Sequence, residues 1–218
     1  AIYDFLYFHT IPAPRTIYRG IAKLLPGQRL LWDGRETRLD FYWHADYTPR
    51  IQSFAARKRE FRGLLDTALA GLDVPGTAAF LSGGTDSSSV VGALTGVRGH
   101  PVDTFSIGFD AAGYDEMEYA RCAADAYRSR AHEYYVKPGD IVDAIPLIAS
   151  AYDEPFGNES AVPTYFCACA ARDAGFTRML AGDGGDEIFG GNARYAKQRL
   201  FENYFRLPAW LRQGAVEP

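Results

Sequence analysis

From residue 77 onward, short apolar runs alternate with longer segments of helical spacing. The apolar runs predict strands at 77–81, 103–109, 132–136 and 177–181. The segments between and after them predict helices at 86–96, 115–127, 138–151, 162–174 and 193–206. Strands that alternate with helices in this way are typical of βαβ units. The pattern therefore predicts an α/β fold, with a parallel sheet flanked by helices.

The first 45 residues follow a different pattern. Two apolar, β-prone runs flank Asp33-Gly34, a dipeptide preferred in tight hairpin turns, so we expect a β-rich segment. The string IPAPRT before them reads as a connector. The first ten residues resemble the middle of a strand or a helix more than its start. Helical spacing at 51–71 predicts a helix.

Composition narrows the class of protein. The chain has 218 residues, of which 47% are apolar and 23% charged, close to the average for globular proteins. No apolar stretch approaches the roughly 18 residues that span a bilayer, so no membrane helix is expected. A net charge of −4 argues against binding to nucleic acid. Cys122, Cys167 and Cys169 are too few for a disulfide framework, and we expect reduced, core or near-core thiols in a cytoplasmic protein.

A run of glycine and hydroxyl side chains follows the strand predicted at 77–81. Its sequence is Leu81-Ser82-Gly83-Gly84-Thr85-Asp86-Ser87-Ser88-Ser89. Glycines let a backbone approach an anion closely, and free N–H groups at a helix start attract phosphate, so the run predicts a nucleotide-binding loop. Asp86 would either cap the helix or hold a Mg²⁺ ion that bridges phosphate oxygens. The Lys of a Walker A loop is absent, and the alternative is a well-capped turn without a ligand.

A second glycine loop follows the strand predicted at 177–181. It carries three carboxylates within five residues, Asp183, Asp186 and Glu187, on a segment that reads as flexible. Crowded carboxylates repel one another, and a divalent cation or a cationic ligand would offset that repulsion. Both glycine loops stand at carboxyl ends of strands, where parallel sheets bind ligands, so Asp86 and Asp186 are expected to share one metal ion. The alternative is an exposed acidic loop.

The segment 152–165 is a polar loop that leads into the helix predicted at 162–174. One interpretation is purely structural, with Ser160 as the N-cap and Pro163 in the first turn. The other interpretation is contact with a substrate. The residues favour neither. The four histidines are scattered along the chain, which argues against a histidine metal site and against a Ser-His-Asp triad.

Together these motifs resemble the synthetase domain of glutamine-hydrolysing asparagine synthetases, within the PP-loop ATP pyrophosphatase superfamily. The matching strings are LSGGTDSSS, TFSIGF, YDE at 114–116, DEPFGNESAVPTY and AGDGGDEIFGG, in the family's order. The resemblance covers about residues 11–200. It implies an adenine nucleotide alpha-hydrolase-like fold. Residues 1–45 would be the remnant of a glutaminase-like domain with its connector, and 46–218 the truncated ATP-binding domain.

The resemblance also implies an activity. In this family ATP adenylates a carboxylate, and ammonia from a glutaminase domain then displaces AMP to give an amide, with aspartate as the acceptor in the name-giving members. The implied partners are ATP, Mg²⁺, a carboxylate such as aspartate, and ammonia. Related amidotransferases and cyclases, including β-lactam synthetases and lasso-peptide cyclases, use other acceptors. A nucleotide-binding module without turnover is a further alternative, and the assembly state stays open, with a homodimer among the choices.

Family roles carried onto this chain define a candidate site. The implied nucleotide-binding residues are Leu81, Ser82, Gly83, Gly84, Asp86, Ser87, Ser88, Ile107 and Gly182. Among these, Ser82 to Ser87 would cradle the pyrophosphate portion, and the backbone around Leu81, Ile107 and Gly182 would frame the adenosine. Asp86 and Asp186 would hold Mg²⁺. The implied catalytic residues are Asp183, near the acyl carbon and the incoming ammonia, and Glu187.

Three departures from the family pattern refine these expectations. The family's glutaminase uses an N-terminal cysteine, whereas this chain begins with Ala1 and should not hydrolyse glutamine. The family's synthetase domain continues beyond residue 218 and supplies further basic residues to the phosphates, so the isolated fragment is expected to be inactive. Ala181 and Asp183 replace a Ser and a Glu of some members, which leaves the acceptor carboxylate open.

Overall fold

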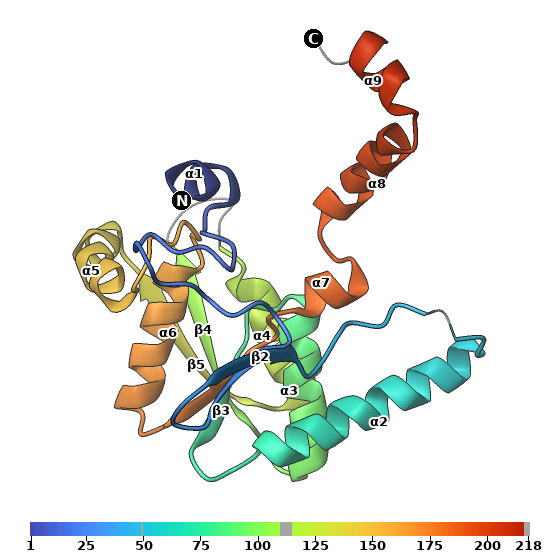
Figure 1. The fold of residues 1–218 in the computed structure, drawn as a ribbon. Coiled ribbons are helices and arrows are strands. Elements are labelled where there is room, and N and C mark those ends of the chain that lie inside the picture. The colour runs from blue at the N-terminus through green and yellow to red at the C-terminus, as the bar shows by residue number, and fades with distance from the viewer. Residues whose placement is uncertain (49, 110–114, 216–218) are drawn as a thin grey trace. The chain divides into compact units, whose positions relative to one another are not determined.

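The computed structural model describes residues 1–48, 50–109 and 115–215. They form an α/β fold with a four-stranded parallel sheet flanked by helices and a small antiparallel hairpin near the N-terminus (Figure 1). The predicted fold class is confirmed. Tyr114, the first residue of the YDE string, lies outside the described residues.

The sheet places the ends of two strands beside each other. Its strands are β3 (Thr77–Phe80), β4 (Asp103–Phe109), β5 (Arg130–Val136) and β6 (Arg178–Leu180), in the order β5-β4-β3-β6. Strand β3 is parallel to both of its neighbours, β4 and β6. The chain adds β4 and β5 on one side of β3 and then returns to add β6 on the other. The strand order reverses between β3 and β6, and a reversal of this kind opens a crevice beyond the carboxyl ends of the strands.

Helices follow the strands much as the apolar pattern predicts. They are α2 (Phe54–Leu72), α3 (Thr85–Arg98), α4 (Met117–Tyr127), α5 (Pro138–Ala151), α6 (Ala161–Asp173), α7 (Gly185–Phe189), α8 (Ala193–Phe205) and α9 (Ala209–Ala215). Two of them, α7 and α9, were not predicted. Helix α4 begins after Asp115 and Glu116, which were expected inside it, and Glu116 is its N-cap. None of the helices in the described part of the chain has the length and apolar character needed to cross a bilayer.

The N-terminal region is less rich in strands than expected. It contains the helix α1 (Ile2–Phe8) as well as the hairpin of β1 (Gln28–Trp32) and β2 (Thr37–Phe41). The hairpin turn forms at Asp33-Gly34, where the Asp33 carboxylate accepts the N–H groups of Arg35 and Glu36 at 2.9 Å each. Gly34 supplies the positive φ of +96° that the turn requires.

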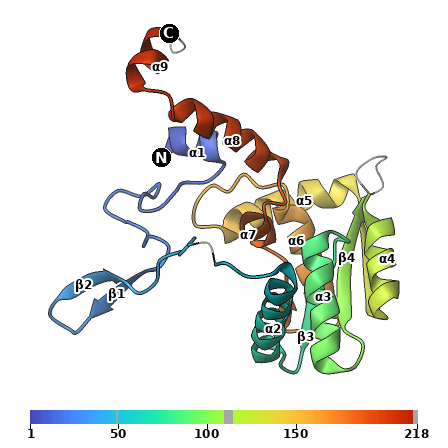
Figure 2. The same cartoon turned by 90° about the vertical axis from the view of Figure 1, so that its right-hand side faces the viewer.

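The chain packs as two compact units, Ala1–Leu65 with Ile107–Asp115 and Tyr134–Asp173, and Asp66–Ser106 with Glu116–Glu133 and Ala174–Pro218. In the second unit α3 packs against β3 and α4, and Figure 2 shows α3 lying along β3. The fully buried side chains of α3 include Val91 and Leu94. The predicted domain boundary between residues 45 and 46 stays a prediction.

The cysteines differ in their burial. Cys167 is buried and Cys169 is half-buried, but Cys122 on α4 is exposed, so the expectation that all three lie in or near the core is wrong for Cys122. Within the described residues, none of the three forms a disulfide. The reason is position on the helix: the buried residues of α4 are Met117, Ala120 and Ala124, three and four residues apart, and Cys122 lies off that stripe.

Candidate functional site

The first glycine loop closes on itself through two serine side chains. The Ser87 hydroxyl accepts the Ser82 N–H at 3.3 Å and donates to the Gly84 carbonyl at 3.2 Å. The Ser82 hydroxyl accepts the Gly84 N–H at 3.3 Å and lies 3.0 Å from the Ser87 hydroxyl. Because Ser87 already donates to Gly84, Ser82 is the donor between the two hydroxyls. This ring of hydrogen bonds fixes the shape of the loop before any ligand arrives.

Helix α3 begins with unpaired backbone donors. Its N-cap is Gly84, no side chain caps it, and its first intrahelical hydrogen bond joins the Ser88 N–H to the Gly84 carbonyl at 3.0 Å. Within residues 1–48, 50–109 and 115–215, no acceptor bonds the N–H groups of Thr85, Asp86 and Ser87. These groups, with the positive end of the helix dipole, suit an anion. Asp86 lies inside the first turn, so the capping role considered for it is wrong.

Gly83 is the tightest point of this loop. Its φ is +85°, a left-handed conformation that side chains other than glycine adopt with strain. A Cβ at this position would also run into the backbone of Tyr119 and Ala120 in the first turn of α4. The glycine therefore lets the loop sit directly on α4, and a larger residue would push the two apart.

The second glycine loop meets the first at Asp86. A Cβ on Gly182 would lie 2.7 Å from both the Asp86 carbonyl carbon and the Ser87 nitrogen. A Cβ on Gly185 would overlap the Asp86 carboxylate. The loop after β6 thus packs its backbone against the first turn of α3. The two loops stand side by side at the reversal of strand order, between the carboxyl ends of β3 and β6.

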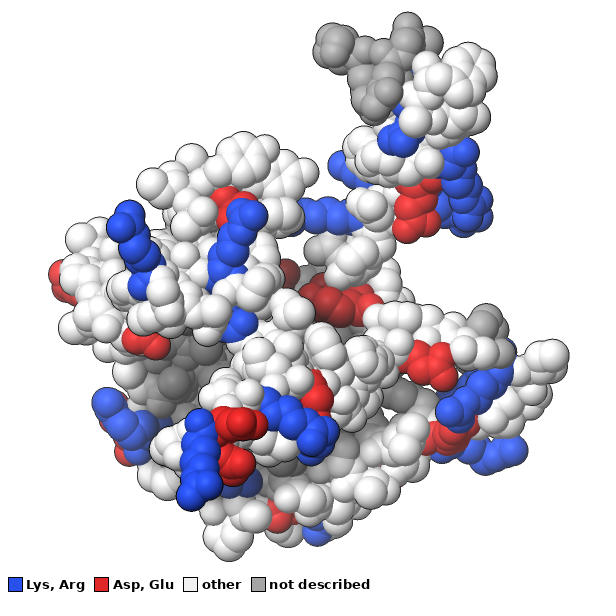
Figure 3. Space-filling model, viewed as in Figure 1, with Lys and Arg blue, Asp and Glu red and all other residues white. Residues whose placement is uncertain are grey.

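These loops and the helix starts that follow them carry four carboxylates, namely Asp86, Asp183, Asp186 and Glu187. Asp183 is exposed in the turn after β6. Asp186 and Glu187 were expected on a flexible loop but lie in the first turn of α7, where the helix dipole favours negative charge. Figure 3 shows acidic side chains over α7. In the described ranges, no lysine, arginine or histidine forms an ion pair with any of the four.

These carboxylates fit a magnesium ion that phosphate oxygens help to bind. Among the described residues no three His, Cys, Asp or Glu side chains stand close enough to hold a metal by themselves. Mg²⁺ usually takes only one or two carboxylates and completes its shell with water and substrate phosphates. Asp86 meets that requirement, since its carboxylate lies against the Gly185 backbone without a cationic partner in the described chain. Asp186 follows Gly185 directly, and its Oδ1 lies against Gly191.

The remaining predicted nucleotide-binding residues, Leu81, Ser88 and Ile107, are buried or half-buried. The Leu81 side chain is buried, its N–H bonds to the Phe105 carbonyl at 3.0 Å, and its carbonyl accepts the Ser106 hydroxyl at 2.6 Å. Ser88 carries a buried hydroxyl that has no hydrogen-bond partner among the described residues. Ile107 is half-buried in β4 and belongs to the first unit.

Thr85 and Gly185 also belong to the candidate site, although no role was predicted for either from the motifs. Thr85 contributes a free N–H, and Gly185 contributes the close approach to Asp86. The position of Thr85 just after a Gly-Gly pair was a usable signal, because the first N–H groups of a helix have no partner within the helix and Gly84 offers no side chain to cap them. The contact of Gly185 is tertiary and has no local signal.

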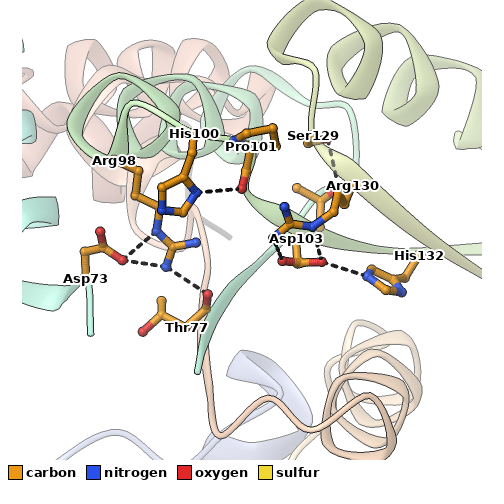
Figure 4. A network of polar contacts seen from close by, with 10 residues as sticks. Asp73, Thr77, Arg98, His100, Pro101, Asp103, Ser129, Arg130 and His132 are labelled. Atoms are coloured by element: carbon orange, nitrogen blue, oxygen red, sulfur yellow. Dashed lines mark hydrogen bonds and ion pairs between the residues drawn. The ribbon is translucent and has the colours of Figure 1, made fainter. Parts of the chain in front are cut away.

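A separate polar network stands at the amino ends of the strands (Figure 4). Buried Asp103 accepts two hydrogen bonds from Arg130, at 3.0 and 2.5 Å, and one from His132 at 3.1 Å. Burial raises the pKa of Asp103, but the bonds from Arg130 and His132 outweigh it and hold the pKa below its ordinary value. Arg98 likewise bonds Asp73 at 2.6 Å. Because Arg98 and Arg130 are each paired with an aspartate, we interpret this network as a contribution to stability. No sequence motif predicted it.

Comparison with known proteins gives a consistent result. The family model described as asparagine synthase matches residues 60–217. The chain is 38% identical to a putative glutamine-hydrolysing asparagine synthetase 2 of Methanocaldococcus jannaschii, over 95% of the chain and 41% of that protein. It is 30% identical to the glutamine-hydrolysing asparagine synthetase 1 of Bacillus subtilis, over 98% of the chain and 34% of that protein. The chain thus spans well under half the length of these curated relatives.

Among solved structures, the NMN synthetase of Francisella tularensis is similar to this chain with a TM-score of 0.42 and 15% sequence identity. The match covers 61% of this chain and 57% of that one.

Proposed function

The chain belongs to the asparagine synthase family, and we propose that its two glycine loops bind ATP for the formation of an amide through an acyl-adenylate. The observation that carries the proposal is the apposition of the loops, with Gly182 and Gly185 packed against Asp86. That apposition supports one shared site, to which the first loop would contribute free backbone donors and both loops would contribute carboxylates. Donors suit phosphate oxygens, and carboxylates suit the metal ion that accompanies them.

The pyrophosphate portion of ATP would lie on the first loop. The N–H groups of Thr85, Asp86 and Ser87 point out of the helix start and would donate to phosphate oxygens. The hydrogen-bond ring of Ser82 and Ser87 already holds the loop in shape, so little ordering entropy is lost on binding. This supports a preformed phosphate cradle.

Asp86 and Asp186 would hold Mg²⁺ between the carboxylates and the phosphates. When bound, the ion would neutralise phosphate charge and assist the displacement at the α-phosphorus as a Lewis acid. The protein itself would contribute by holding the Asp86 carboxylate in position. Gly185 keeps its backbone against the Asp86 carboxylate, because any side chain there would push that carboxylate away.

Asp183 and Glu187 are the proposed catalytic carboxylates. In the second step the lone pair of ammonia attacks the acyl carbon, the bond from that carbon to the AMP oxygen breaks, and the nitrogen loses a proton. Asp183, exposed in the turn between β6 and α7, would accept that proton, and Glu187 in the first turn of α7 would add negative charge that stabilises the cationic nitrogen. No side-chain nucleophile takes part.

The names of the relatives support the choice of acceptor. Both relatives described above are named asparagine synthetases, one of them as a putative one, so aspartate is the proposed acceptor and a glutaminase domain is the proposed source of ammonia. Because the chain spans only 41% and 34% of those proteins, both assignments concern the activity of a whole family member. Two alternatives are compatible with the same two loops: an enzyme that uses a different acceptor carboxylate, and a module that binds the nucleotide without turnover.

The test compares Asp86→Asn with the matched control Asp125→Asn, which removes an exposed carboxylate of α4 outside both loops. Calorimetric titration with ATP and Mg²⁺ should show binding that Asp86→Asn weakens about tenfold or more, because a charge-assisted contact worth about 1.5–3 kcal/mol is lost. Asp125→Asn should bind normally. Equal binding by the two variants would refute the assignment of Asp86, and no binding by the unchanged protein would refute the ATP site.

A turnover assay with ATP, Mg²⁺, aspartate and ammonia, in a whole protein that contains this chain, identifies the acceptor. Release of pyrophosphate together with asparagine would support aspartate as acceptor. Pyrophosphate without asparagine would indicate another carboxylate. Nucleotide binding without pyrophosphate would indicate a binding module.

A further inference from the structure

The segment from His9 to Lys23, called the connector below, is bound to the loop 153–157. Glu154 is the centre of the attachment. Its Oε1 accepts the Ile17 N–H at 2.9 Å, and its Oε2 accepts a hydrogen bond from Lys23 Nζ at 2.5 Å. The same Lys23 ammonium donates to the Ile11 carbonyl at 2.5 Å. One lysine therefore joins both the connector backbone and the loop.

Two further hydrogen bonds reach the loop from other points of the connector. The Gly157 N–H donates to the His9 carbonyl at 2.9 Å, and the Tyr18 hydroxyl donates to the Asp153 carbonyl at 2.7 Å. Ile11 is only 2% exposed, so the connector also contributes to a core. A flexible tether between domains would have neither a buried side chain nor hydrogen bonds along its length.

The attached loop forms one wall of a cavity of about 540 Å³ in the first unit. Helix α1, which immediately precedes the connector, contributes Phe5 to the lining, and α5 and α6 contribute Ile148 and Val162. From the loop side, Tyr152 stacks on Phe156 with their ring centres 4.8 Å apart. Two walls of the cavity are therefore joined through the connector.

We propose that Lys23 and Glu154 form a latch by which the connector fixes the loop 153–157 and, with it, the wall of this cavity. Both side chains are partly withdrawn from water, with 36% of Lys23 and 19% of Glu154 exposed, so their ion pair is less screened than a surface pair. Release of the latch frees the loop and opens the cavity wall. The connector thus works as a control element of the first unit, which goes beyond the proposed function and does not depend on it.

The Glu154 carboxylate keeps its charge at neutral pH. The hydrogen bond from Lys23, helped by the Ile17 N–H, holds the pKa of Glu154 below its ordinary value. Removal of the ammonium leaves a half-buried carboxylate with one backbone donor. The loop should then open more often, and its backbone amides should exchange with solvent faster.

Hydrogen exchange resolved by NMR tests the latch, with the Gly157 amide as the reporter. Lys23→Met should speed exchange at Gly157 by about fivefold, because loss of a partly exposed ion pair shifts an opening equilibrium by about that factor. The matched control is Arg15→Met, which removes an exposed cation of the same connector that pairs with Asp4 in α1. Exchange at Gly157 should be unchanged in the control. Equal rates in both variants would overturn the proposal.

The more conservative Glu154→Gln keeps a side-chain oxygen for the Ile17 N–H and removes only the charge. It should also speed exchange at Gly157, and the double variant with Lys23→Met should add little to either single change, because both changes break the same pair. Additive effects would contradict the latch. The Val91 amide in the core of α3 monitors the fold, and if Lys23→Met unfolds the protein, Glu154→Gln alone carries the test. No step uses ATP, so the outcome is independent of the nucleotide site.

Discussion

Alanine at Gly83 should destabilise the protein much more than alanine at the neighbouring Gly84. The left-handed φ of +85° at Gly83 costs a side-chain-bearing residue about 1–2 kcal/mol. The new Cβ would also overlap the backbone of Tyr119 and Ala120, and such overpacking costs about 1–3 kcal/mol. The expected loss in the free energy of unfolding is therefore about 2–5 kcal/mol, the sum of these two contributions.

Gly84 is the matched control because it adjoins Gly83 without either constraint. Its φ is −67°, and a Cβ there would make an ordinary contact of 3.4 Å with the Ser82 hydroxyl. Gly84→Ala should cost about 1 kcal/mol or less, the difference between glycine and alanine at an N-cap. Urea unfolding followed by far-UV circular dichroism measures both variants. Equal midpoints would refute the close packing of the loop on α4.

Two further predictions concern titration. The pKa of Asp103 is lowered in the folded state, so its stabilisation is present above the ordinary value of 3.8 and is lost as the pH falls through the lower, folded value. Asp103→Asn should therefore reduce the free energy of urea unfolding at about pH 6, and the deficit should shrink toward about pH 3; a deficit independent of pH would contradict the ion-pair network. Burial raises the pKa of Cys167 to about 12, so a thiol reagent should modify exposed Cys122 in the native protein and Cys167 only after denaturation. Equal rates of modification in the native protein would contradict this difference.

Elements with strong, bounded patterns could be predicted from the sequence. β4 and α5 have the predicted bounds, because β4 is an apolar run buried for most of its length and α5 starts at Pro138, with the Asp140 carboxylate accepting the Lys137 N–H at 2.9 Å. The convergence of the two glycine loops was also predictable in outline. It follows from their positions at the carboxyl ends of parallel strands.

The features that could not be predicted from the sequence depend on contacts between residues far apart in the chain. The glycine-rich segment that forms α7 has poor helix propensity, yet it folds between Gly184 and Gly190, both with positive φ, where its backbone packs on Asp86. The ion pairs of Asp103 with Arg130, and of Glu154 with Lys23, join residues far apart in the chain. Local patterns carry no information about such pairs, and only the folded arrangement reveals them.

The central claim, that the two glycine loops form one ATP site, is tested most directly by a crystal structure of the protein with Mg²⁺ and a non-hydrolysable ATP analogue. We predict that the phosphates contact the N–H groups of Thr85 to Ser87 and that the metal ion contacts Asp86, with the residues 182–186 on the other side of the nucleotide. A nucleotide bound elsewhere, or held by the first loop without any contact to 182–186, would contradict the claim.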